Sequence, residues 1–354
     1  QGLIAKYGEA EKKKVYDWWD EHLTKTTAEF MQFVDWDGVN GKRKPKDRMT
    51  IRAYPLKRVD AVNDKLTVPE RIDLFLGQQM DQFVANGPRY VQTYRLPGPA
   101  RYGEQGNMFY RADTYDTAVA AIYLAMRGQL QRACDLADGL CTALEHDSIG
   151  GGRIVAATKA DSVIDPNDGY ATSIFYPDGG THDIGNMCWA GIALTRLYAK
   201  TRQTRYLHNA RLIGNWIKTE CLVMDDAFGF SGGVDAWGAK RLWRSVEHNV
   251  DAYAFFKNLG ALTSDAQWNE AANHAQKLVL ACRLAAGYYV TGTGNDKTLN
   301  AGIVPTDAQS WTALAKLNES GNEQSLQYML DKLSAQTAGY SGFKFALAGS
   351  NIQN

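Results

Sequence analysis

Apolar side chains recur at helical spacing along most of the chain, and the pattern repeats. Four segments each contain an apolar helix, a short polar turn and a second, more charged amphipathic helix. The apolar helices contain residues 115–122, 186–193, 250–256 and 308–314, and the turns fall near Gly128, Gln203, Ser264 and Asn322. The second helices, for example 205–218 and 267–277, are more charged, which predicts inner and outer helices of a ring.

The connections from each outer helix to the next inner helix are long and rich in glycine and aromatic residues. They cover 148–183, 225–244, 287–304 and the chain from 339 onward. Because each long loop enters the N-terminal end of an inner helix, all should gather on one face, where function concentrates on such scaffolds. Strand signals are few. Short alternating pieces at 228–230 and 288–291 predict small hairpins within the loops.

Helical spacing also extends over residues 8–36, before a basic, proline-containing loop at 42–57 and a helix at 68–86. Thr67, Pro69 and Glu70 start that last helix as a capping box with proline in the first turn. We therefore predict an all-α fold, a single (α/α)6 or (α/α)7 toroid of helical hairpins over residues 1–354, with long loops on one face. Helices within 8–86 complete the ring, and the repeated hairpins span 108–340.

Composition removes several classes of function. Lysine plus arginine equals aspartate plus glutamate at 39 each, so no overall field favours nucleic acid or a membrane surface. No apolar run is long enough for membrane insertion. The cysteines lie on apolar helical faces without a CxxC motif, which predicts buried free thiols: Cys134, Cys141, Cys188, Cys221 and Cys282.

Familiar cofactor and nucleophile motifs are also missing. The six histidines show neither HxxxH nor HxH spacing, so we expect no metal and no cofactor. The glycine-rich segments at 150–153 and 288–294 lack the strand-loop-helix context and the lysine of a phosphate loop. A Ser-His-Asp hydrolase is disfavoured because the nucleophile-elbow motif is absent.

Reactive side chains are densest between Trp243 and Phe256, directly behind a loop rich in glycine, tryptophan and basic residues. Every predicted inner helix also opens with polar residues, which an inward-facing helix tolerates only where they line a cavity. These residues are Arg111, Asp113, Tyr115 and Asp116; His182, Asp183 and Asn186; Arg244, Glu247, His248, Asn249 and Asp251; and Thr306, Asp307 and Gln309.

Helix capping accounts for part of this polarity. Ser245 is a predicted N-cap, Thr306 with Gln309 forms a capping box, and the acids Asp113, Asp183 and Asp307 suit helix N-termini. Capping does not explain the central stretch. On a helical wheel the side chains of Arg244, Glu247, His248, Asp251 and Phe255 share an arc of about 100°, whereas Val246, Asn249 and Tyr253 lie toward the other side. The structural alternative is a buried network that ties this helix to its neighbours.

The helix openings Tyr115–Ala118, Gly185–Ala190 and Ser245–Tyr253, with the loop Tyr289–Gly294, resemble a family of bacterial exported (α/α)-toroid proteins associated with exopolysaccharide processing. The resemblance covers residues 108–350. Within the toroid class, the chain is similar first to polysaccharide lyases of the alginate and glucuronan type and second to glycoside hydrolases. The resemblance implies a long acidic glycan as substrate and a secreted or periplasmic protein whose signal peptide has been removed.

A lyase must neutralise a uronate carboxylate, remove the adjacent proton and protonate the departing oxygen. The predicted neutralisers are Asn186 or Asn249 with Arg244, the base is His248 or His182, and the acid is Tyr253 or Tyr289. Glu247 completes the predicted catalytic set. Aromatic rings stack on sugar faces and basic groups hold carboxylates. The predicted substrate-binding residues are accordingly Arg111, Tyr115, Asp116, Trp237, Lys240, Arg241, Trp243, Asn249, Asp251 and Tyr289.

Two alternatives stay open. A glycoside hydrolase needs two carboxyl groups, for which Glu247 with Asp116, Asp183 or Asp251 qualifies. A non-catalytic glycan-binding protein needs only the aromatic platforms. The basic cluster formed by Lys240, Arg241 and Arg244 favours the lyase.

Overall fold

The computed structural model describes residues 31–36, 43–51, 66–84, 86–94, 109–171, 180–224, 228–337 and 340–348. The chain divides into two compact units, residues 1–75 and 76–354. The helix predicted over residues 8–30 lies outside the described residues. Completion of the ring by N-terminal helices, and with it the single domain over 1–354, therefore stays a prediction.

In the first unit, β1 (Met31–Trp36) pairs antiparallel with β2 (Arg43–Ile51). The predictions of a helix end and a loop for these two segments were wrong. Apolar and polar side chains alternate from Met31 to Phe33, and a register shift between Val34 and Trp36 absorbs the break in alternation. The two-residue period therefore decided the structure of this segment.

Helix α4 (Val68–Asp81) begins where the capping box predicted. The backbone N–H and the hydroxyl of Thr67 donate to the Glu70 carboxylate at 2.7 and 2.8 Å. The helix ends at Asp81, five residues earlier than the predicted end at residue 86.

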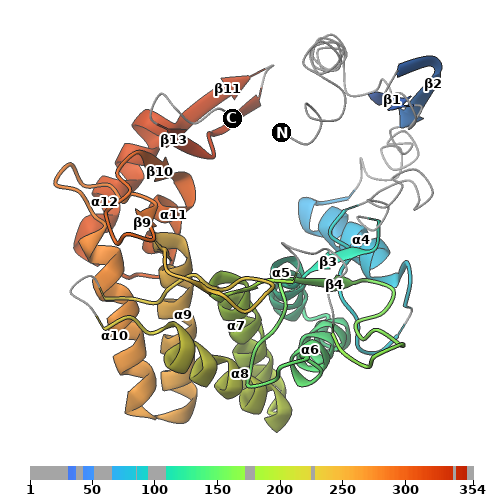
Figure 1. Cartoon of the computed structure of the whole chain (residues 1–354), viewed down its shortest axis with the longest axis horizontal. Helices are drawn as coiled ribbons and strands as arrows, with labels where there is room; N and C mark the ends of the chain where they lie inside the picture. The colour runs from blue at the N-terminus through green and yellow to red at the C-terminus, as the bar shows by residue number, and fades with distance from the viewer. Residues whose placement is uncertain are drawn as a thin grey trace. The chain divides into compact units, whose positions relative to one another are not determined.

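Four helical hairpins follow one another from α5 to α12 (Figure 1). They are α5 (Thr114–Met126) with α6 (Leu130–Glu145), α7 (Ile184–Thr201) with α8 (Thr204–Trp216), α9 (Val246–Thr263) with α10 (Ala266–Ala281), and α11 (Thr306–Leu314) with α12 (Glu319–Tyr328). The π-helices η3 (Ile217–Cys221) and η4 (Met329–Leu333) extend α8 and α12. Three turns fall where predicted, whereas Asn322 lies inside α12 and the fourth turn occupies residues 315–318.

The first helix of each hairpin lies on the inside. Helices α5, α7, α9 and α11 contact one another in that order, and each packs against its own outer partner. The core fills the space between the two layers with side chains such as Leu124, Leu136, Leu194 and Trp268. Gly191 in α7 contacts the Phe255 ring in α9, and a Cβ at this glycine would overlap that ring. Close packing thus fixes the inner helices side by side.

Short strands hold the start of each inner helix. Strands β3 (Arg111–Asp113), β5 (His182–Asp183), β8 (Arg244–Ser245) and β10 (Ile303–Pro305) precede α5, α7, α9 and α11. Each pairs antiparallel with a strand of a later loop: β4 (Ala157–Lys159), β6 (Gly233–Val234), β9 (Gly292–Thr293) and β13 (Ala346–Ala348). Strand β7 (Lys240–Arg241) joins β6, and β11 (Ser334–Thr337) pairs with β12 (Tyr340–Phe343). The loops are therefore anchored to the helix openings.

The hairpins predicted at 228–230 and 288–291 are single bridges, Leu222 with Phe230 and Arg283 with Tyr289. All five cysteines are buried free thiols, as predicted. Among the described residues, no helix combines the length and the apolar character needed to span a lipid bilayer.

Candidate active site

A cavity of 760 Å³ lies at the N-terminal ends of the four inner helices. Its position follows from the repeat, because Tyr115, Glu247 and Asp307 are each the second residue of an inner helix, and Asp116 and Asn186 are each the third. Five carboxylates and one arginine line it: Asp113, Asp116, Asp183, Glu247, Asp307 and Arg111. The repeat thus concentrates acids at one place.

Glu247 and Asp307 form a hydrogen-bonded carboxyl pair. Burial, and then the negative charge and hydrogen bond of Asp307, raise the pKa of Glu247 to about 7. Burial also raises the pKa of Asp307, but its hydrogen bonds oppose this, including one from the Ala308 N–H at 2.6 Å. Two carboxyl groups this close cannot both ionise easily, so they share a proton, and Glu247 holds it near neutral pH.

The α5 side of the cavity holds Tyr115 and Asp116. Burial, together with the surrounding acids, raises the pKa of Tyr115 to about 12, so its phenol keeps its proton at neutral pH. Burial raises the pKa of Asp116, while a hydrogen bond from Thr93 lowers it. The Arg111 guanidinium donates to both carboxylate oxygens of Asp113 at 2.8–3.1 Å, which neutralises that acid.

Asp183 is also held by a cation. It accepts hydrogen bonds from Arg241 and, at 2.6 Å, from the Thr181 hydroxyl. Neither Asp113 nor Asp183 caps its helix, although both occupy the N-cap position. The predicted cap at Ser245 is present, since its hydroxyl accepts from the His248 N–H at 3.4 Å.

The capping box predicted for Thr306 and Gln309 is absent, so that prediction was wrong. The Gln309 side chain is fully buried and bonds to both backbone groups of Tyr289, at 2.9 and 2.7 Å. Satisfying a buried loop backbone outweighs capping of an exposed helix end.

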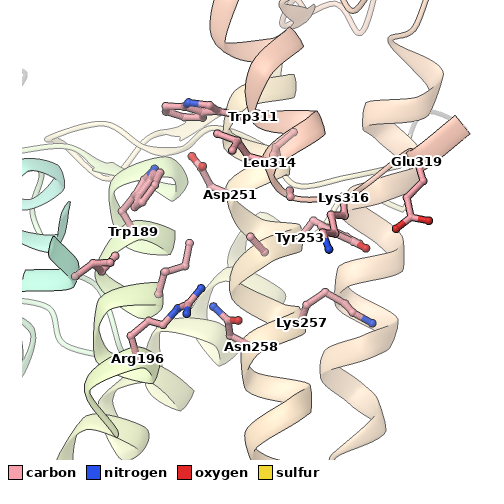
Figure 2. Close-up of a pocket in the computed structure, with 15 residues that line it drawn as sticks. Trp189, Arg196, Asp251, Tyr253, Lys257, Asn258, Trp311, Leu314, Lys316 and Glu319 are labelled. Atoms are coloured by element: carbon pink, nitrogen blue, oxygen red, sulfur yellow. The ribbon is translucent and has the colours of Figure 1, made fainter. Parts of the chain in front are cut away.

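Three aromatic rings border the carboxylate cavity: Tyr115 and Trp311 line it, and Trp189 contacts both of them. The ring centroids of Tyr115 and Trp189 are 5.4 Å apart, and those of Trp189 and Trp311 are 5.7 Å apart, both edge to face. A second cavity of 620 Å³ includes Trp189 and Trp311 in its lining (Figure 2). Trp311 also lines the carboxylate cavity, so this aromatic layer lies between the two cavities.

Asp251 and Tyr253 belong to the second cavity. Asp251 lies one helical turn after Glu247, and its carboxyl points toward the two indoles in Figure 2. It is only 4% exposed, and burial, followed by the charges of Glu247 and Asp307, raises its pKa strongly. Asp251 is therefore a neutral acid outside the carboxylate cavity.

Four of the predicted site residues have structural contacts instead. His182 Nε2 lies 2.8 Å from the Asp147 carboxylate, which also binds Arg153. The Asn249 amide bonds to the backbone of Phe230, and the Tyr289 hydroxyl accepts from Asn318 at 2.9 Å. Arg244 is 1% exposed and donates to the Phe228 carbonyl at 3.0 Å. These contacts tie loops to helices and explain the buried polar groups without chemistry.

The predicted basic cluster does not form one patch. Lys240 is exposed beside Glu220, with Nζ 3.3 Å from the carboxylate, whereas Arg241 binds Asp183 and Arg244 is buried. Trp237 is 68% exposed and is absent from the lining of the described cavities. His248 and Trp243 line a third hollow beside the carboxylate cavity.

Sequence reasoning underestimated Asp307 and did not single out Trp189, Trp311, Thr93 or Tyr94. Asp307 was named among the polar residues at the helix openings and as a capping acid, but it was given no catalytic or binding role. Its signal was its place in the repeat, because it corresponds in α11 to Glu247 in α9. Among the described residues, no group of three or more His, Cys, Asp or Glu side chains has the arrangement of a metal site.

In sequence, the chain matches no family model and no curated protein. In structure it is similar to cellobiose 2-epimerase from Spirochaeta thermophila DSM 6192, with 12% identity, a TM-score of 0.56, and coverage of 78% of this chain and 70% of that chain. It is also similar to a sugar epimerase from a ruminal bacterium (10% identity, TM-score 0.54, coverage 82% and 75%) and to a glycosidase variant (10%, 0.53, 75% and 69%). These similarities confirm the predicted all-α toroid of helical hairpins.

Proposed function

We propose that this protein is a carbohydrate-active enzyme that hydrolyses glycosidic bonds in an uncharged glycan. The observation that carries the proposal is the Glu247–Asp307 pair, in which a partly exposed carboxyl group with a pKa of about 7 lines a cavity rich in other carboxylates. Glycoside hydrolysis needs such a proton donor together with an ionised carboxylate.

Glu247 is the proposed general acid. Its carboxyl proton passes to the glycosidic oxygen as the bond between that oxygen and the anomeric carbon breaks. Asp307 keeps this proton in place, because its negative charge raises the pKa of Glu247. The two groups are too close to act as acid and base on opposite sides of a sugar, which requires at least about 5 Å between carboxyls.

Asp116 is the proposed general base. Arg111 neutralises Asp113 and Arg241 neutralises Asp183, whereas the hydrogen bond to Asp116 comes from the neutral Thr93 hydroxyl. Asp116 would take a proton from the water whose oxygen bonds to the anomeric carbon. Helix α7 lies between α5, which carries Asp116, and α9, which carries Glu247. The two carboxyls thus come from non-adjacent helices that line one cavity, and the proposed inversion requires about 6.5–9.5 Å between them.

The charge of the cavity supports hydrolysis over β-elimination. A lyase must hold a uronate carboxylate, but the cavity lining contains five acids and one arginine that is already paired. A polyanion would be repelled here. The lyase preference depended on a basic cluster, but Lys240 and Arg244 do not line this cavity, and Arg241 beside it already binds Asp183. No histidine is among the described residues that line it.

The test is to incubate the protein with uncharged β-glucans, mannuronan and glucuronan, while reducing ends and ultraviolet absorbance of unsaturated sugars are followed together. New reducing ends from an uncharged glucan, without that absorbance and lost in Glu247→Gln, are expected. Unsaturated ends from a uronan would overturn the proposal in favour of a lyase, and binding without cleavage would favour the non-catalytic alternative.

A further inference from the structure

A hollow of 470 Å³ adjoins the carboxylate cavity on the loop face. The two are neighbours because consecutive residues of α9 line them, Glu247 the carboxylate cavity and His248 the hollow. The side chain of Arg241, which binds Asp183 of the carboxylate cavity, also lies over the Trp243 ring of the hollow, at 6.0 Å from its centroid. The hollow and the cavity thus share a wall.

The wall of the hollow is preformed. Trp243 contacts the imidazole of His248, with ring centroids 5.4 Å apart. The backbone N–H of Trp243 donates to the Asn295 side-chain oxygen at 2.9 Å, which ties the two loops together. Pairing of β8 with β9 fixes the backbone beside them. An indole held in this way can receive a ligand without first losing its own freedom of motion.

One nitrogen of the His248 imidazole lacks a hydrogen-bond partner in the described part of the chain. One edge packs against Gly185 of α7, where any Cβ would overlap the ring. Its Nδ1 is buried and has no hydrogen-bond partner among the described residues. Burial lowers the pKa of His248, so the ring is neutral and has one nitrogen able to accept a hydrogen bond. A buried polar atom left in this state points to a missing partner.

Apart from Ile303 and the buried Arg244, the remaining side chains of the lining are polar and uncharged. They include the hydroxyl groups of Ser245 and Thr291 and the amide of Asn300. An indole face beside hydroxyl, amide and imidazole groups matches a pyranose ring, which has an apolar face and hydroxyl groups at its edge. Buried Arg244, which also lines the hollow, is held by the Phe228 carbonyl and the Thr293 hydroxyl.

We propose that this hollow is a second saccharide subsite, which binds another unit of the glycan whose bond is cleaved beside Glu247. The inference rests on the proposed function and deepens it, since the substrate must then be an oligosaccharide or polysaccharide. The sugar face stacks on Trp243, and the sugar hydroxyls bond to the polar side chains of Ser245, Thr291 and Asn300.

The experiment measures kcat/KM for uncharged β-gluco-oligosaccharides of increasing length. The wild-type value should rise with length, and Trp243→Ala should lose roughly tenfold on the long substrates and much less on the shortest. Trp243→Phe keeps a ring and should recover most of the loss. Trp237→Ala is the matched control, because it removes an exposed indole six residues earlier from the same loop and should match wild type.

An equal loss on every length in Trp243→Ala would overturn the subsite while leaving hydrolysis intact. If the wild-type protein cleaves no oligosaccharide, the proposed function fails, and binding then tests the hollow separately. Calorimetric titration with the longest oligosaccharide should in that case give weaker binding to Trp243→Ala than to Trp237→Ala. Equal binding to both variants would refute the subsite.

Discussion

The carboxylate cavity and the second cavity lie on either side of the aromatic layer of Tyr115, Trp189 and Trp311. They differ in charge, although α7, α9 and α11 contribute to both. Acids dominate the carboxylate cavity, whereas the ionisable side chains of the second cavity are Arg196, Lys257, Lys316, Glu319 and Asp251, of which Asp251 is neutral. Within α9, Glu247 of the carboxylate cavity and Asp251 of the second cavity are one turn apart. Glu247 is partly exposed and has a pKa of about 7, whereas Asp251 is 4% exposed and burial raises its pKa well above its ordinary value.

This difference shows that access to solvent and substrate, rather than residue type, separates an acid that can exchange protons from one that cannot. A general acid is most effective when its pKa lies near the working pH. Glu247 meets that condition, and Asp251 holds its proton too firmly. Variants that remove one acid at a time therefore test whether the chemistry is confined to the carboxylate cavity.

The largest effect is expected for Glu247→Gln. Removing the general acid should lower kcat on an uncharged glycan by about 10²–10⁴-fold. Activity on an aryl glycoside with a good leaving group should fall far less, because that leaving group needs no proton. Parallel rate measurements on the two substrates check this. An equal loss on both would assign Glu247 a structural role.

Asp116→Asn should have the next largest effect, again of about 10²–10⁴-fold, but on both kinds of substrate. Loss of the base slows attack by water whatever the leaving group. Azide, which attacks without a base, should partly restore the rate, and the glycosyl azide product can be identified by mass spectrometry. Asp183→Asn is the comparison variant, and a larger loss there than in Asp116→Asn would move the role of base to Asp183.

Asp307→Asn should change the pH dependence more than the maximal rate. Without the negative charge of Asp307, the pKa of Glu247 falls, so the alkaline limb of kcat/KM should move to lower pH. Activity near pH 7 drops because less Glu247 is protonated. A pH series from acid to neutral on one oligosaccharide measures the shift, and an unchanged limb would mean that Asp307 does not control the proton.

The smallest effect on activity is expected for Asp251→Asn, which should instead change stability. The pKa of Asp251 is higher in the folded than in the unfolded chain, so the folded state binds more protons between these two values. Wild-type stability attributable to Asp251 should thus fall as pH rises through that interval, by up to about 1.4 kcal/mol per pH unit. Asparagine stays neutral, and denaturant unfolding at several pH values should show its advantage growing with pH.

The spacing of apolar residues along the chain predicts much of the fold. The four inner helices, three of their four turns and the loop-bearing face follow from it, because an amphipathic helix must bury one side. The segment 31–36 was mistaken for helix, since its four apolar positions in six fit either period. The strands before the inner helices are two or three residues long, too short to leave a pattern.

The site was less predictable than the fold. Glu247, Tyr115, Asp116, Asn186 and Arg111 were anticipated at the cavity, because polar residues at the start of an inner helix have few other reasons to occur. His182 and Asn249 have the same signature yet serve as buried hydrogen-bonding groups. Only distant contacts, with Asp147 and Phe230, distinguish them, and spacing along one helix carries no information about those contacts.

The pH dependence of kcat/KM on an uncharged oligosaccharide is the most direct test that Glu247 in the carboxylate cavity is the proton donor. Wild type should lose activity as pH rises through about 7, the pKa of Glu247, and Asp251→Asn should give the same curve. In Glu247→Gln, assayed on the activated aryl glycoside, this alkaline limb should be absent. A wild-type rate that stays constant across neutral pH, or a limb that persists in Glu247→Gln and disappears in Asp251→Asn, would contradict the account.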